Sequence, residues 1–238
     1  MVIYMISRMM CLFLTGLFAL NGYADIGVSP IVADLAGKDA DIEMAVKNGD
    51  LKNNAYVEIT PWRVINPANH ASPKQLARHP ETDGILVFPA KIILLPGQTQ
   101  YVRIVKTAKN ISSDQVFEVD FIPKVATHLI SQKNSSGSAI GIRVIVGYGA
   151  RVILRPDVPS PSISVKRINK KLVIKNTGNT ALTITSCTQQ IAHQTVQIPL
   201  SAYTIFANQT ITKDLRAVTP IKLDVSYVGK MMGPFYTN

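Results

Sequence analysis

An alternation of apolar and polar residues with a period of two constrains this chain most. It is interrupted by Gly, Pro or Asn at intervals of roughly ten to fifteen residues. Such alternation is typical of β-strands, and helical periodicity is nearly absent. The sequence therefore predicts an all-β fold. Strands are expected at residues 26–35, 41–47, 55–62, 85–88, 91–94, 100–106, 116–123, 162–168, 171–176, 181–187, 202–206, 209–214 and 221–228.

Two groups of strands are separated by a proline-rich segment. Residues 155–162 carry Pro156, Pro159 and Pro161, a composition typical of linkers between domains. Residues 66–84 are polar and also proline-containing, and we expect them to form a long exposed loop. The pattern predicts two β-sandwiches, with residues 25–156 as the first domain and 157–238 as the second.

The first 24 residues have the pattern of a secretory signal. Arg8 precedes a nearly continuous apolar run over 9–20, and the segment ends in Ala24 after small and polar residues. The run is too short to span a bilayer, which takes about 20 residues. We therefore expect residues 1–24 to be a cleaved signal peptide and the mature protein to be periplasmic or secreted.

The stretch 138–156 contains an unusual apolar comb. Large apolar residues occupy every second position at Ile140, Ile142, Val144, Val146 and Tyr148, and two arginines follow, Arg151 and Arg155. A strand would point all five apolar residues to one face. It would also exceed the usual five or six residues. An ordinary two-sided core strand is one interpretation, and a strand that binds another protein is the other.

Motifs for catalysis, metals and nucleotides are not evident. The four histidines are scattered, and no nucleophile elbow, zinc-protease motif or phosphate loop occurs. Removal of Arg8 lowers the net charge from +10 to +9, but the basic residues are not interleaved with stacking aromatics, so nucleic acid is not an expected partner. Cys187 would be the one cysteine of the mature chain, a half-buried structural thiol at a strand end. We expect no cofactor, no metal and no enzymatic activity, although a secreted hydrolase stays open.

Several stretches resemble the periplasmic fimbrial chaperones of the chaperone/usher pathway. They are AYVEI (55–59), LVFPAKIILLPGQTQYVRIV (86–105), VFEVDFIP (116–123) and ARVILRP (150–156). VSPI (28–31), RVINP (63–67), GYGA (147–150) and KNTGN (175–179) are similar to the alternate, colonisation-factor type. The resemblance covers most of residues 26–187. It implies two immunoglobulin-like domains in an L shape with a cleft between them.

The resemblance also implies roles for individual residues. Chaperones of this family lend a strand to pilus subunits that lack their last strand. Ile140, Ile142, Val144 and Val146 would be the donor residues, pointing away from the chaperone's own core. Arg151 would anchor the subunit's C-terminal carboxylate, while Arg155, with Asp114 as its partner, would fix the angle between the domains.

One departure concerns the cleft. Most family members carry a second cleft arginine in the first strand, and the matching position here is Pro30. Either another cation replaces it, or Arg151 works with backbone donors.

The expected function is therefore binding, folding and capping of pilus subunits and their delivery to an outer-membrane usher. The expected partners are fimbrial subunits and the usher, with no insertion into the membrane, and self-association through the donor strand stays open. A secreted β-sandwich pilin or adhesin subunit is the alternative. A pilin should alternate strongly at its N-terminus, whereas residues 25–35 alternate weakly and contain Pro30.

Overall fold

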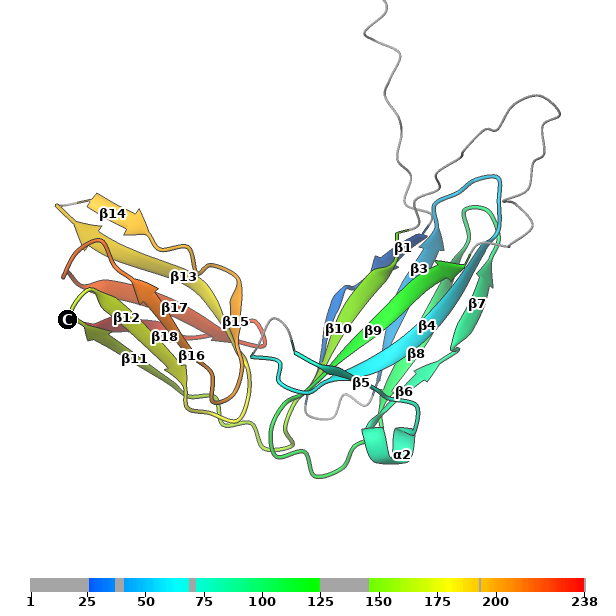
Figure 1. The fold of residues 1–238 in the computed structure, drawn as a ribbon, viewed down its shortest axis with the longest axis horizontal. Helices are drawn as coiled ribbons and strands as arrows, with labels where there is room; N and C mark the ends of the chain where they lie inside the picture. The colour runs from blue at the N-terminus through cyan, green and yellow to red at the C-terminus, as the bar shows by residue number, and fades with distance from the viewer. Residues whose placement is uncertain (1–25, 37–40, 69–71, 125–145, 193, 238) are drawn as a thin grey trace, which may run out of the picture.

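The structure is a computed structural model that describes residues 26–36, 41–68, 72–124, 146–192 and 194–237. Two β-sandwiches form an L, which opens towards the top of Figure 1. Strands up to β10 pair only with one another, and the same holds from β11 onwards. The all-β, two-sandwich prediction is confirmed. No described helix is long and apolar enough to cross a membrane.

The N-terminal sandwich has two sheets. One has the order β1–β3–β8–β6, and its strands are Ile26–Ser29, Asp41–Asn48, Thr99–Lys106 and Ile85–Phe88. The other has the order β2–β10–β9–β4–β5, with β7 also paired to β4. Its strands are Val32–Leu35, Tyr148–Leu154, Gln115–Lys124, Ala55–Val64, Lys74–Leu76 and Lys91–Leu94. β2 runs parallel to β10, and the other pairs are antiparallel.

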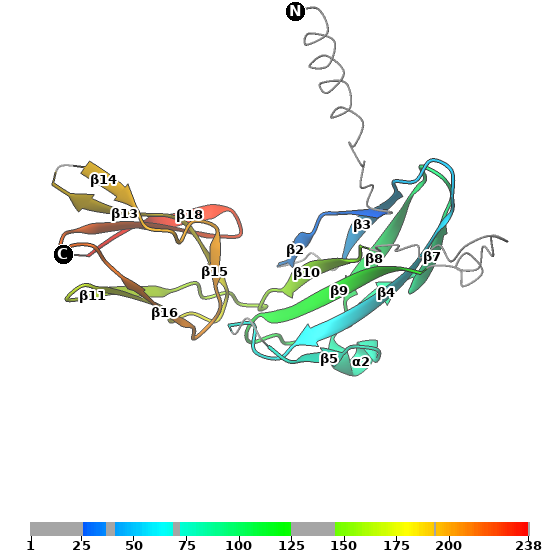
Figure 2. The same ribbon diagram turned by 45° about the horizontal axis from the view of Figure 1, so that its top comes forward.

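The C-terminal sandwich also has two sheets. The smaller has the order β11–β12–β16, with strands Ile163–Ile168, Lys171–Asn176 and Thr210–Asp214. The larger has the order β14–β13–β17–β18, with β15 paired to β13. Its strands are Gln194–Gln197, Leu182–Ile191, Ile221–Tyr227, Lys230–Thr237 and Tyr203–Ile205. Figure 2 draws β13 and β18 above β11 and β16.

The period-two pattern explains the cores. Inward positions of β9 place Phe117, Val119 and Phe121 in the first core, and inward positions of β12 place Leu172 and Ile174 in the second. Burying each such side chain fully stabilises the fold by about 1.5–3 kcal/mol. No disulfide is needed, and Cys187 is itself a core residue.

Several predicted boundaries were wrong. Residues 26–35 form two strands in different sheets, because Pro30 has no N–H to continue a ladder and the chain crosses between the sheets there. The predicted loop 66–84 contains β5 and the short helix α2 (Pro80–Asp83). β14 and β18 were not predicted. Cys187 lies inside β13 and is fully buried, not half-buried at a strand end.

A proline-rich segment connects the sandwiches. β10 ends at Leu154 and β11 begins at Ile163, so the chain between them spans the three prolines recognised in the sequence. We retain the boundary between residues 156 and 157 as a proposal.

Candidate functional site

The site begins with the two faces of β10. Ala150, Val152 and Leu154 are buried, and they lie opposite Val119, Phe117 and Gln115 of β9. The alternate residues Gly149 and Arg151 belong to the outer face, and the Arg151 side chain is exposed. The Arg151 backbone N–H donates to the Ile31 carbonyl at 2.8 Å, which fixes the strand beside β2.

The comb continues the inward face of β10, not the outward one. Tyr148, its last residue, is half-buried and packs against the N-terminal core, which corrects the expectation that the comb points away from it. The reason is parity, since Tyr148 is two residues from the buried Ala150. Val146 precedes the strand and is 45% exposed. The other predicted donor residues, Ile140, Ile142 and Val144, lie outside the described residues.

Arg151 lines a hollow between the two sandwiches. The hollow has a volume of about 270 Å³, and it is bounded by Val64, Val116 and Lys74 on one side and by Tyr203, Phe206 and Gln209 on the other. β5, which follows β4 as a hairpin, carries Lys74 into this space. Sequence reasoning missed Lys74, because a three-residue strand has too little alternation to be recognised.

Charges in the hollow are unbalanced in favour of cations. Lys74 is ion-paired with Glu118 of β9, and Glu118 is also the cross-strand neighbour of Arg151. Within the described part of the chain, no acidic group lies at ion-pair distance from the Arg151 guanidinium. Asp120 lies on the same face; burial, and then the negative charge of Glu118, raise its pKa. The hollow thus has two cations and one paired carboxylate, and a further carboxylate would neutralise it.

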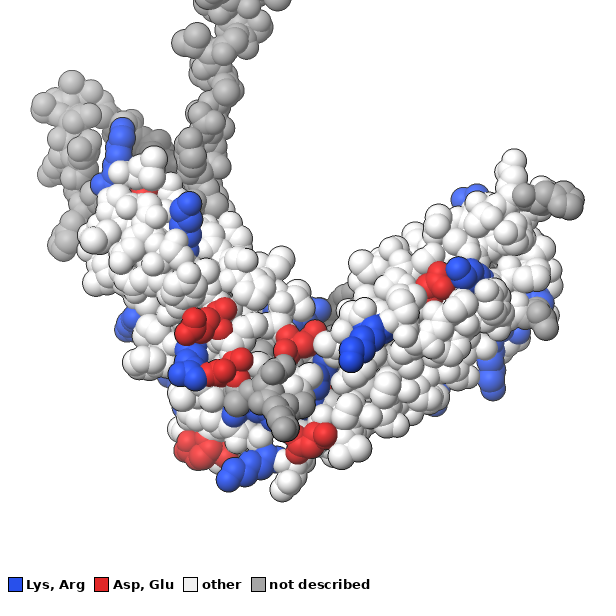
Figure 3. All heavy atoms as spheres, turned by 180° about the vertical axis from the view of Figure 1, so that it is seen from behind, with Lys and Arg blue, Asp and Glu red and all other residues white. Residues whose placement is uncertain are grey.

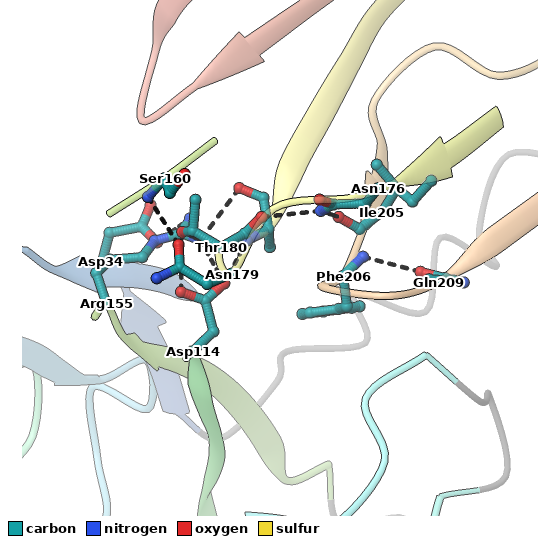
Figure 4. Close-up of polar contacts among 11 residues, drawn as sticks. Asp34, Asp114, Arg155, Ser160, Asn176, Asn179, Thr180, Ile205, Phe206 and Gln209 are labelled. Atoms are coloured by element: carbon teal, nitrogen blue, oxygen red, sulfur yellow. Dashed lines mark hydrogen bonds and ion pairs between the residues drawn. The ribbon is translucent and has the colours of Figure 1, made fainter. Parts of the chain in front are cut away.

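Arg155 and Asp114, the predicted interdomain residues, lie together at the junction. Arg155 Nη1 is 2.9 Å from Asp114 Oδ2, and Nη2 is 2.6 Å from Asp34 Oδ1 (Figure 4). Asp34 was not identified from the sequence, because it was assigned to an ordinary strand. The Arg155 side chain is buried, and its guanidinium also lies 5.7 Å from the centre of the Tyr227 ring.

The same network reaches into the C-terminal sandwich. Thr180 Oγ1 donates to Asp114 Oδ1 at 2.9 Å, and the Ala181 N–H donates to Asp114 Oδ2. Arg155 Nη1 donates to the Ala181 carbonyl at 3.3 Å. Burial raises the pKa of Asp114, although the Arg155 charge opposes that shift. Asp114 therefore accepts from both sandwiches, and its position ties them together.

Two further contacts join the sandwiches. The Asn179 side chain donates to the carbonyls of Ser112 and Val158 at 3.0 Å each, so the turn after β12 docks on the junction. On the other side of the hollow, Gln209 Nε2 donates to the Ala68 carbonyl at 3.2 Å. Apolar packing of Val116, Ile153, Ala181 and Phe206 fills the space between these polar contacts.

The described residues contain no cluster of His, Cys, Asp and Glu that could hold a metal ion. His79 lies beside α2, and no other histidine is among the residues described. What the arrangement offers is therefore a charged recognition site between two rigid sandwiches.

Comparison with known proteins supports the fold. No protein-family model and no curated protein matches the sequence. Solved structures match along nearly the whole chain, and they include the class 5 fimbriae chaperone CfaA at 17% identity and a TM-score of 0.67, with 89% of this chain and 97% of that chain covered.

Two chaperone complexes also match. One is a chaperone–tip adhesin complex of CFA/I fimbriae biogenesis, at 18% identity and a TM-score of 0.66, covering 90% of this chain and 97% of the matched one. Another is the Salmonella enterica SafA pilin in complex with the SafB chaperone, at 16% identity and a TM-score of 0.58, covering 90% and 96%. The chain has the β-sandwich fold of the fimbrial chaperones, which confirms the predicted fold.

Proposed function

We propose that this chain is a periplasmic, non-enzymatic chaperone that binds fimbrial subunits by lending them a strand. The observation that carries the proposal is the position of Arg151. It lies on the exposed face of β10, at the edge of a hollow between the sandwiches, five residues after Val146, the last of the predicted donor residues. A cation in this place suits the C-terminal carboxylate of a subunit.

Lys74 is the second anchor in this proposal and takes the role that Pro30 cannot fill. Arg151 would donate directly to the carboxylate, whereas Lys74 would share its charge between the carboxylate and Glu118. Hydrogen bonds to charged groups contribute about 1.5–3 kcal/mol each. Arg151 should therefore matter more than Lys74, because Lys74 keeps a partner in the free protein.

The parity of β10 supports a particular form of strand donation. Ile140, Ile142, Val144 and Val146 have the sequence parity of Tyr148 and Ala150, whose side chains face the core. A lent strand of this parity would continue the chaperone's core layer into the subunit. β9 runs on to Lys124, beyond the last pair of its ladder with β10, Phe121 with Tyr148.

The anchor and the comb together form a ruler. A strand advances about 3.3 Å per residue, so Arg151 and Val146 are separated by about 17 Å. A subunit held at its C-terminus would therefore present fixed positions of its last strand to the comb. Removing one residue from that C-terminus would offset the alternation, whereas removing two would restore its parity.

Capture of a subunit tests the proposal. The chaperone is co-expressed with the fimbrial subunit encoded beside it, and the complex is recovered by pull-down. Arg151→Ala and Val146→Asp should each reduce recovery by about 10-fold or more, and Lys74→Ala by less. Lys47→Ala, an exposed lysine on the opposite sheet, is the matched control. Normal recovery with Arg151→Ala and Val146→Asp would refute donation from this strand.

Delivery to an usher would need a second surface. The outer face of the β1–β3–β8–β6 sheet exposes Phe88 (68%) and Tyr101 (61%), with Leu86 on the same face. Exposed apolar groups of this size are typical of protein contacts. We propose that this face contacts the usher. Phe88→Ser and Tyr101→Ser together should block fibre assembly on cells while subunit capture stays intact, and normal assembly would exclude this face.

A further inference from the structure

The C-terminal sandwich carries most of the net charge. Residues 163–238 contain two acidic residues, Asp214 and Asp224, against nine basic ones: Lys166, Arg167, Lys170, Lys171, Lys175, Lys213, Arg216, Lys222 and Lys230. Residues 25–156 are more balanced, with 15 basic and 12 acidic residues. In Figure 3 the acidic side chains gather on the N-terminal sandwich and the junction, with little red on the C-terminal sandwich.

Strand register collects three of these lysines on one flat face. Leu172 and Ile174 of β12 face the core, so Lys171, Val173 and Lys175 face outwards. Lys166 of β11 lies directly opposite Val173. Residues two apart along a strand, and diagonal neighbours on adjacent strands, are about 7 Å apart. The three ammonium groups therefore stem from a triangle with sides of about 7 Å.

The face offers these lysines little internal compensation. Asp214 is its one acidic residue in the described part of the chain, opposite Lys171. None of the three lysines has an acidic group within ion-pair distance among the described residues, whereas the ion pairs of the N-terminal sandwich involve Lys74, Arg103, Lys106 and Lys124. Adjacent like charges destabilise a sheet. A folded protein gains from them only through an external anion.

The chemistry of the face favours a lipid surface over other anions. Lysine is a compact point charge, whereas arginine suits the paired oxygens of one defined carboxylate or phosphate. Ser164, Thr210 and Thr212 share the face and supply hydroxyls, and the face has no aromatic ring to stack on a nucleic-acid base. Ile168 is 57% exposed at its end and can reach the apolar boundary of the headgroups.

We infer that the outer face of the β11–β12–β16 sheet binds an anionic phospholipid membrane peripherally. The face lies away from the open side of the L (Figures 1 and 2), so a membrane there leaves the Arg151 hollow accessible. The inference uses the periplasmic location proposed above, where two membranes are within reach, but none of the residues proposed to bind subunits. The binding is electrostatic and does not require insertion.

Flotation of the purified protein with vesicles tests the inference. The protein should float with vesicles that contain phosphatidylglycerol and not with vesicles of phosphatidylcholine alone, and added salt should weaken the binding. Each lysine near an anionic surface contributes a factor of about five. Replacing Lys166, Lys171 and Lys175 by Ala should therefore reduce binding by about 100-fold.

A matched triple variant distinguishes this face from general positive charge. Lys47, Lys52 and Lys91 are exposed lysines of the N-terminal sandwich, and their replacement by Ala removes the same charge. This control should bind like the wild type. Equal loss in both triple variants, or wild-type binding by the first, would overturn the inference, as would binding to an acidic protein without binding to the vesicles.

The two proposals fail separately. Arg151→Ala should lose subunits and keep vesicle binding, and the triple variant of the face should do the reverse. Identical unfolding curves for the triple variant and the wild type would show that its loss is not caused by misfolding.

Discussion

Asn48 ends β3 in the N-terminal sandwich, and Asn176 ends β12 in the C-terminal one. Each is buried and accepts a hydrogen bond from the backbone N–H two residues on, at 3.0 Å from Asp50 and 2.9 Å from Gly178. Asn48 Nδ2 also donates to the carbonyls of Leu94 and Leu95, and Asn176 Nδ2 to those of Thr180 and Ile205. Both sandwiches thus close a turn with the same device.

Their use of charge is different. The N-terminal sandwich pairs many of its charges internally, as in Arg103–Asp41 and Lys124–Glu58. In the described part of the C-terminal sandwich the one ion pair is Lys222–Asp224. The difference indicates that similar folds were adapted to different tasks, one to a specific carboxylate and the other to a diffuse anionic surface.

Breaking the junction should have the largest effect on this comparison. Arg155→Met leaves Asp114 and Asp34 without their cation, and loss of one member of a buried pair costs about 3–5 kcal/mol. The two sandwiches should then unfold in separate steps, measured by denaturant unfolding. Arg103→Met is the control, because an exposed pair contributes about 1 kcal/mol at most. A single transition of unchanged midpoint would contradict the role of Arg155.

The same variant should depend on pH. Burial raises the pKa of Asp114, so the folded state retains a proton at a pH where the unfolded state has lost it. Stability therefore falls as the pH rises from the unfolded pKa through the folded pKa. Without Arg155 that pKa rises further, and the destabilisation should be smaller at pH 5 than at pH 8.

Cys187 reports on the C-terminal sandwich alone. Burial, together with the nearby Asp224, raises the pKa of its thiol to about 11. At pH 8 its thiolate fraction is about 200-fold lower than that of an exposed cysteine. Alkylation of the periplasmic protein should therefore be at least that slow, and faster in Arg155→Met. Rapid labelling of the native wild type would contradict this burial.

Gly178→Ala should have a moderate effect, because the new Cβ would lie 2.2 Å from the Ser160 carbonyl oxygen and 2.7 Å from the Ser162 nitrogen. Both atoms belong to the backbone, so relief requires the junction to move, at a cost of about 1–3 kcal/mol. Gly27→Ala is the counterpart in the N-terminal sandwich, where no atom lies within 4 Å of the added Cβ. Thermal unfolding of both variants measures the difference, and equal loss would refute the steric argument.

Exposed charges should give the smallest effects, but of opposite sign in the two sandwiches. Lys175→Ala relieves like-charge repulsion and should be neutral or stabilising, whereas Arg103→Ala removes a pair and should be destabilising, each within about 0.5 kcal/mol. Added salt should shrink both differences. The same sign for both variants in low salt would remove the proposed contrast.

Alternation in the sequence was sufficient to predict the strands with one buried face, such as β6, β7 and β12, whose limits match. It failed where pairing depends on distant residues. β5 has three residues and forms only because the end of β4 lies beside it. β18 contains Gly233 and Pro234, which hide its alternation.

Site prediction shows the same division. Arg151, Arg155 and Asp114 could be named from the sequence, because a family pattern gives their positions along the chain. Lys74 and Asp34 could not, since their roles arise from a hairpin and from a parallel strand that bring distant segments together. The parity of the comb was misread, because alternation alone does not tell which of two faces is inward; the buried partner strand β9 decides it.

The three polar contacts between the sandwiches also have a mechanical consequence. A single connecting segment leaves one body free to rotate about three axes relative to another, and two attachment points leave rotation about the line that joins them. The contacts made by Asp114, Asn179 and Gln209 provide three attachments, and the last lies on the other side of the hollow. The width between Arg151 and Tyr203 is thus held like the jaws of a fixed gauge, and a partner is accepted or rejected by its own dimensions.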